Sequence, residues 1–151
     1  MLEERLAFVG RDNNYRGSEN AMKMRMLAAA AVLVSAAVHL YLWFNVFRHT
    51  DVVGPAFMLN AGGGTIIAVL LVTWRHWIPL VLAVGFGAST LGAFLIATTA
   101  GLFGVHEHWT GWAVWTAAAS EVVAILAAGT VLLQENPLRS PDRPEQPVPG
   151  R

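Results

Sequence analysis

The chain has 151 residues, of which 55% are hydrophobic and only 13% are charged, against about 25% charged residues in an ordinary soluble domain. This composition excludes an ordinary soluble globular protein, and the lack of cysteine excludes disulfides, thiolate nucleophiles and iron–sulfur clusters. The formal net charge is zero, which gives no reason to expect nucleic acid as a partner.

The N-terminal part of the chain combines a polar segment with the first apolar one. Residues 1–23 are polar, mixed in charge and rich in turn-forming residues, and they predict a cytosolic tail with a frayed start. The apolar segment at about 26–47 is longer and begins later than the core of a secretory signal peptide, which has about 7 to 15 residues. It therefore predicts a retained helix. Translation starting at Met22, Met24 or Met26 instead of Met1 is left open by the sequence.

Three further apolar segments follow, at about 53–72, 78–103 and 111–133. Each is long enough to cross a bilayer core, which requires about 20 apolar residues per helix. Residues 135–151 are rich in proline and predict a disordered cytosolic tail. The sequence thus predicts an all-α membrane protein whose residues 24–134 form an up-down four-helix transmembrane bundle.

Positive charge is distributed unevenly between the two ends of these segments. The N-terminal tail with the adjoining Arg25, the connection between the second and third segments and the C-terminal tail together hold nine Lys and Arg residues, whereas the opposite end holds Arg48 alone. Cytoplasmic loops carry the excess of Lys and Arg in membrane proteins. We therefore predict a multi-pass protein of the plasma membrane with both termini in the cytosol.

Small residues recur at four-residue steps in the later apolar segments. In lipid, helices associate through close backbone approach at such small residues rather than through a hydrophobic driving force. The pattern predicts tight helix packing, either within one bundle or against a partner chain. The residues concerned are Ser89, Ala93, Ala97 and Gly101 in the third segment, Thr116, Ser120, Ala124 and Ala128 in the fourth, and Gly62, Gly63 and Gly64 in the second.

Three strongly polar side chains fall well inside the apolar segments: His39, Asn60 and Glu121. At 1.5 Å per residue they lie about 12 Å, 9 Å and 16 Å from the same end of the bundle, so the sequence predicts one polar layer. Polar groups at such depth are costly and usually face the bundle interior, which makes them candidates for an intramembrane binding site. The alternatives are hydrogen bonds that fix helix register and contact with a partner protein.

A second polar group lies in the predicted external loops and comprises His49, His106, Glu107 and His108. Imidazole and carboxylate together suit zinc or copper(II), but alternating loop histidines fix no metal geometry, so these residues are weak metal candidates. Haem held between facing helices needs two histidines, and His39 alone lies within an apolar segment. No catalytic motif is present. The sequence therefore predicts no enzyme activity and assigns no cofactor.

Three short segments resemble a known group of proteins: residues 39–43 (HLYLW), 53–60 (VGPAFMLN) and 101–107 (GLFGVHE). Together they are similar to small four-span integral membrane proteins that are widespread in actinobacteria, over about residues 35–130. The resemblance implies a four-helix membrane fold and no particular activity. It places His39, Asn60 and Glu107 within matching segments without giving them a role.

The primary functional interpretation is an accessory or scaffolding subunit of a larger membrane assembly, because the chain is small and its loops are short. One alternative is a small proton- or ion-linked transporter that uses His39, Asn60 and Glu121. A second alternative is a membrane subunit that binds metal, haem or quinone. The expected partners are the lipid bilayer and either a second copy of the chain, as a homodimer, or a larger membrane complex.

Overall fold

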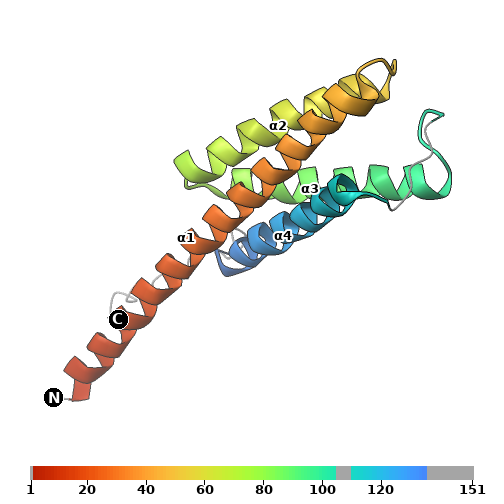
Figure 1. The fold of residues 1–151 in the computed structure, drawn as a ribbon. Helices are drawn as coiled ribbons and strands as arrows, with labels where there is room; N and C mark the ends of the chain where they lie inside the picture. The colour runs from red at the N-terminus through yellow and green to blue at the C-terminus, as the bar shows by residue number, and fades with distance from the viewer. Residues whose placement is uncertain (1, 105–109, 136–151) are drawn as a thin grey trace, which may run out of the picture.

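The computed structural model describes residues 2–104 and 110–135, with side chains from residue 17 onward. Within these residues the chain forms α1 (Leu2–Leu42), the short π-helix η1 (Trp43–Phe47), α2 (Val53–Thr73), α3 (Trp77–Thr99) and α4 (Trp112–Glu135) (Figure 1). Each of the four α-helices contains a segment long and apolar enough to cross a membrane. The predicted all-α architecture with four such helices is confirmed.

Two helix boundaries differ from the prediction. The expected frayed start is wrong, because α1 already begins at Leu2. Extending an established helix is far easier than nucleating one, and the ion pair between Glu19 and Lys23, 2.6 Å long, joins two successive turns. At the other boundary α3 ends at Thr99 rather than at residue 103. Gly101 has a φ of +82°, and a left-handed glycine ends a helix at low cost.

The helices diverge from one end of the bundle to the other. α1 packs against both α2 and α4, and α3 packs mainly against α4, whereas α2 and α3 make few contacts. We call the end with the short α2–α3 connection (residues 74–76) the tail end, and the end with the connection of residues 48–52 the loop end. Figure 1 shows α2 and α3 close together at the tail end and separating toward the loop end.

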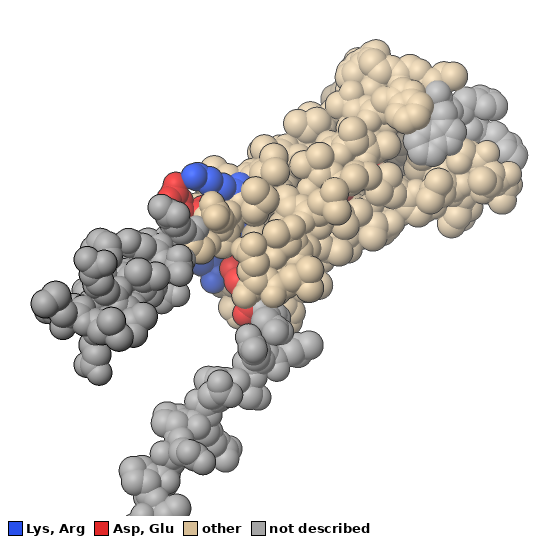
Figure 2. All heavy atoms as spheres, turned by 90° about the horizontal axis from the view of Figure 1, so that it is seen from below, with Lys and Arg blue, Asp and Glu red and all other residues tan. Residues whose placement is uncertain are grey.

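Charged side chains gather at the tail end. On the face shown in Figure 2, Lys, Arg, Asp and Glu lie mainly where α1 leaves the bundle, and the rest of the described surface is almost entirely uncharged. Such an uncharged band is what a helix bundle exposes to lipid. The indole rings of Trp74 and Trp77 are exposed beside the α2–α3 connection, as expected of aromatic residues at a membrane interface.

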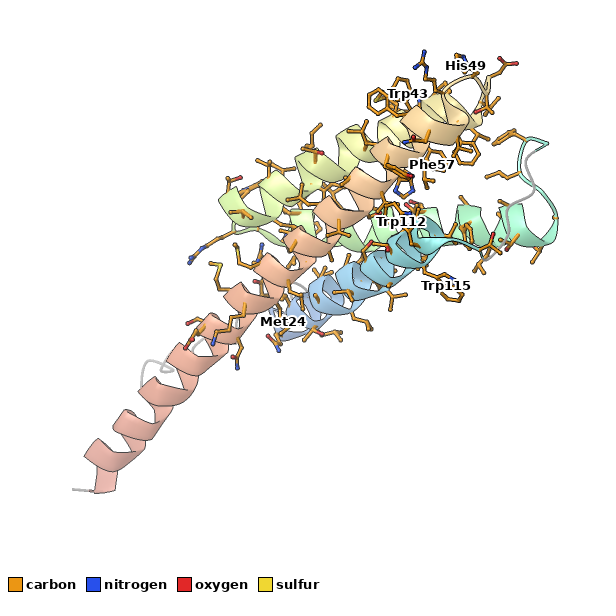
Figure 3. The ribbon with its side chains drawn as sticks, in the orientation of Figure 1. Met24, Trp43, His49, Phe57, Trp112 and Trp115 are labelled. Carbon is orange, nitrogen blue, oxygen red and sulfur yellow. The ribbon has the colours of Figure 1, made fainter. Side chains whose placement is uncertain are left out.

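The loop end is shaped by the π-helix that continues α1. The backbone N–H and the hydroxyl of Thr50 both donate to the Phe47 carbonyl, at 3.0 and 2.7 Å, which turns the chain into α2. Gly54 is required at this turn, because a Cβ there would overlap the Phe47 carbonyl oxygen. The buried Phe47 ring packs on Phe57 of α2 with centroids 4.5 Å apart. Figure 3 shows Trp43 and His49 at this end and Met24 toward the other.

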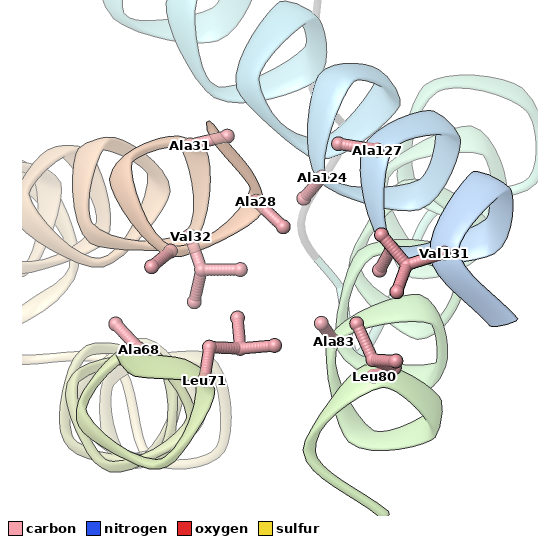
Figure 4. Packing of buried hydrophobic residues seen from close by; sticks show 12 residues of the cluster. Ala28, Ala31, Val32, Ala68, Leu71, Leu80, Ala83, Ala124, Ala127 and Val131 are labelled. Carbon is pink, nitrogen blue, oxygen red and sulfur yellow. The ribbon is translucent and has the colours of Figure 1, made fainter. Parts of the chain in front are cut away.

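The close-packed core occupies the tail-end half of the bundle, and Figure 4 shows its buried side chains from close by. It combines many alanines with a few larger side chains, which lets four backbones approach one another. The buried residues are Ala28, Ala29, Ala31, Val32, Ala68, Leu71, Leu80, Ala83, Ala124, Ala127, Ala128 and Val131. The loop-end half is less completely filled, and a cavity lies there.

Two glycines mark the tightest crossings. A Cβ on Gly87 of α3 would lie 2.8 Å from Ile125 Cγ1 and 3.0 Å from the Glu121 carbonyl of α4. A Cβ on Gly64 of α2 would lie 3.1 Å from the Ala36 Cβ of α1. The crossing at Gly87 brings α3 directly onto the backbone of Glu121, so close packing fixes the position of that polar residue.

The small residues predicted to pack helices together are buried to different extents in α4 and α3. In α4, Ser120, Ala124 and Ala128 are buried against other helices of the same chain. In α3, Ala97 is buried but Ser89 is exposed. The α4 pattern thus serves packing within the bundle, and the α3 pattern does so only in part.

Candidate intramembrane binding site

A cavity of about 430 Å³ lies between the diverging helices of the loop-end half. All four helices and η1 contribute to its walls, which are mainly aliphatic and aromatic, and Phe57 of α2 and Trp112 of α4 are among the lining residues (Figure 3). The polar side chains that line it include His39, Asn60 and Glu121. The three residues that the sequence predicts as one polar layer therefore line the same cavity.

His39, Glu121 and Ser35 form a buried polar cluster where α1 faces α4. Their exposed fractions are 5%, 2% and 0%, respectively. The Ser35 hydroxyl donates a hydrogen bond of 3.1 Å to Glu121 Oε1. This bond joins two helices that are 86 residues apart in the chain. The cluster begins where the alanine-rich core ends.

The position of the His39 ring follows from a hydrogen bond to its own helix. Nδ1 lies 2.8 Å from the Ser35 carbonyl oxygen, and a carbonyl oxygen only accepts, so Nδ1 carries a hydrogen. Nε2 is then directed at Glu121 Oε1, 3.9 Å away. This separation is longer than the roughly 2.7 to 2.9 Å of a charge-assisted hydrogen bond. The ring also packs on Phe57, with centroids 5.1 Å apart.

The His39–Glu121 pair is uncharged overall when it shares a single ionisable proton. With the proton on Glu121 both groups are neutral, and with the proton on His39 Nε2 they form an ion pair. Separated charges are costly in a low-dielectric interior unless they are closely paired and hydrogen-bonded. The long Nε2–Oε1 distance favours the neutral pair, in which the Glu121 hydroxyl and the Nε2 lone pair are both available to a third molecule.

Asn60 and Thr90 also line the cavity but differ in their hydrogen bonding. The Thr90 hydroxyl donates to the Phe86 carbonyl of its own helix at 2.7 Å. The Asn60 amide forms no hydrogen bond with the side chains and backbone that the structure describes. A polar amide in an apolar membrane interior is costly without a partner. Asn60 is therefore a group to which a bound molecule would supply the missing partner.

The structure relates the predicted site residues to one another in different ways. It brings His39 and Glu121 into contact and places Asn60 on the same cavity; their role in binding stays a prediction. His49 lies exposed in the loop-end connection. The other predicted metal ligands, His106, Glu107 and His108, lie outside the described residues. Among the residues described, no three His, Asp or Glu side chains lie close enough to hold a metal ion.

Arg25, counted in the sequence among the basic residues at the N-terminal end of the first apolar segment, is buried in the bundle. Arg25 of α1 is 4% exposed, and its Nη2 donates to the His76 carbonyl at 2.9 Å and to both carboxylate oxygens of Glu135 at 3.0 Å. It thereby joins α1, the α2–α3 connection and the end of α4. The sequence offered one indication of this contact. Arg25 and Glu135 carry opposite charges and stand at the ends of the first and fourth apolar segments that lie on the same side of the predicted bundle.

No protein-family model, curated protein or solved structure matches this chain. The likeness to small four-span proteins of actinobacteria therefore stays a prediction.

Proposed function

We propose that this chain is a multi-pass membrane protein that binds a small, mainly apolar molecule with one uncharged polar group in its loop-end cavity. The observation that carries the proposal is the convergence of His39, Asn60 and Glu121 on one apolar cavity. The apolar part of the molecule would lie against the aliphatic and aromatic walls. Its polar group would bind at the buried cluster.

The size and chemistry of the cavity support this proposal. Small-molecule sites are typically concave, about 300 to 1,000 Å³ in volume, and apolar with a few precisely placed polar groups. The cavity of about 430 Å³ falls in that range. Ionisable residues inside a membrane are expensive and usually functional. A neutral pair offers one donor at Glu121 and one acceptor at His39 Nε2, and Asn60 offers both, which suits a carbonyl, hydroxyl or amine group.

The test is whether the purified protein retains such a molecule in this cavity. The full chain would be purified in mild detergent, extracted with organic solvent and analysed by mass spectrometry, with an absorption spectrum recorded beforehand. Ala93→Phe places a ring in the cavity wall, and Ala88→Phe makes the same change at an exposed position of the same helix. We expect a small molecule in the wild type and in Ala88→Phe and its loss from Ala93→Phe.

Two outcomes would contradict the proposed binding function. One is that nothing is enriched over a detergent blank except bulk phospholipid. The other is that Ala93→Phe, while folded and equally soluble, retains as much of the molecule as Ala88→Phe does.

We also propose that the protein lies in the plasma membrane with both termini in the cytosol. The nine-to-one distribution of Lys and Arg supports this orientation. We expect cytosolic signals from reporters fused to either terminus of the full chain, with a reporter inserted at residue 50 as the opposite control. An external signal from either terminus would exclude the orientation.

The other sequence-based interpretations remain predictions. An accessory role in a larger assembly is compatible with a bound ligand, and co-purifying proteins in the same preparation test it. A proton-linked carrier would use the same cluster but would need the His39–Glu121 pair to gain and lose its proton during turnover.

A further inference from the structure

We propose that the tail end of the bundle binds a phosphate group between Arg25 and Arg75. This site lies at the opposite end from the proposed ligand cavity and does not depend on it. It is formed where α1 leaves the bundle beside the end of α4 and the α2–α3 connection.

The two terminal nitrogens of the Arg25 guanidinium differ in their hydrogen bonding. Nη2 of Arg25 makes all the hydrogen bonds to His76 and Glu135, at 2.9 to 3.0 Å. Nη1 is buried and has no hydrogen-bond partner among the described residues. Buried donors are nearly always satisfied, because leaving one unpaired forfeits its hydration without compensation. Nη1 is therefore a donor that an acceptor bound beside Arg25 would satisfy.

A cavity of about 500 Å³ borders the same residue. Its lining includes Arg25, Arg75, Asn20, Gln134 and Glu135. Two arginines and one glutamate are among its lining residues, and both oxygens of that carboxylate are bonded to Arg25 Nη2. The cavity thus has an excess of one positive charge, with amide donors beside it. Arginine suits phosphate because its planar N–H groups match the spacing of phosphate oxygens.

The position of the site relative to the membrane surface indicates where a phosphate would come from. Trp74 and Trp77 flank Arg75, and tryptophan is enriched at the headgroup level of membranes. Basic pockets beside membrane helices bind anionic lipid headgroups. A phospholipid headgroup and a soluble phosphate share the same chemistry at the site, so the experiment must separate these two sources.

The experiment measures the melting temperature of the full chain in neutral detergent with added dioleoylphosphatidylglycerol. Dioleoylglycerol, which has the same chains and no phosphate, is the lipid control, and inorganic phosphate is the soluble arm. Arg75→Gln removes an exposed positive charge at the site, and Arg48→Gln removes one at the loop end. Because Arg75 makes no contact that holds the bundle together among the described residues, both variants should fold.

We expect phosphatidylglycerol to raise the melting temperature of the wild type and of Arg48→Gln. For Arg75→Gln the lipid concentration needed for half of the effect should increase about fivefold, as the loss of one basic contact implies. Stabilisation by phosphatidylglycerol but not by inorganic phosphate identifies a headgroup, and stabilisation by both identifies a free phosphate. Equal lipid responses in the two variants, or an equal effect of dioleoylglycerol, would overturn the proposal.

Discussion

Glu121→Ala should lower the free energy of unfolding by about 2 kcal/mol, whereas Glu121→Gln should lower it by less than about 1 kcal/mol. Alanine removes the acceptor of the Ser35 hydroxyl, which is fully buried, and enlarges the cavity between α1 and α4. Glutamine retains an oxygen in the same position and fills the same volume. Unfolding of the purified protein by sodium dodecyl sulfate in mixed micelles measures the difference.

Val122→Ala is the matched control, because Val122 is adjacent in α4 and exposed. We expect it to cost less than Glu121→Ala under the same conditions. If Glu121→Gln lowers the free energy of unfolding as much as Glu121→Ala does, the hydrogen bond from Ser35 is not what stabilises this contact. The carboxylate charge itself would then hold the helices together through His39.

Infrared spectroscopy determines which state of the His39–Glu121 pair exists. For the neutral pair we expect a protonated-carboxyl band that is present on both sides of neutral pH and vanishes in Glu121→Gln. Absence of that band in the wild type would indicate an ion pair despite the 3.9 Å separation. A band that titrates near neutrality would favour the proton-linked carrier over simple ligand binding.

The second large effect concerns the Arg25–Glu135 ion pair at the tail end. Glu135→Ala should lower the free energy of unfolding by about 2 kcal/mol and Arg25→Met by about 1 kcal/mol. The asymmetry follows from burial: the side chain of Arg25 is 5% exposed and that of Glu135 is 36% exposed. Among the described residues, removing Glu135 leaves the buried charge with the His76 carbonyl as its remaining partner, whereas Glu135 without Arg25 is still partly hydrated.

The double variant Arg25→Met/Glu135→Ala should be no less stable than Glu135→Ala, because no buried charge is left unpaired. Lys23→Met is the control, since it breaks an ion pair whose two side chains are each about 65% exposed, and such a pair contributes at most about 1 kcal/mol. Additive losses in the double variant would show that the two residues act independently.

The depth of the polar residues could be predicted from the sequence, but their pairing could not. Counting residues from the helix ends placed His39 and Glu121 at similar levels, since the rise per residue is nearly constant. The contact between them also depends on the rotation of α1 and α4 about their axes. Small residues occupy several faces of these helices, so the pattern alone left more than one rotation open.

Hydropathy by itself determined the number of membrane-length helices, because the requirement for about 20 apolar residues acts on each segment separately. The tertiary structure alone decided what lies between the helices. Gly87 lets α4 pack closely on α3. α2 and α3 separate toward the loop end, and a cavity lined by His39, Asn60 and Glu121 forms there. It also decided that Arg25 meets Glu135 across 110 residues of chain. Both results depend on crossing angles, which arise from the packing of all four helices together.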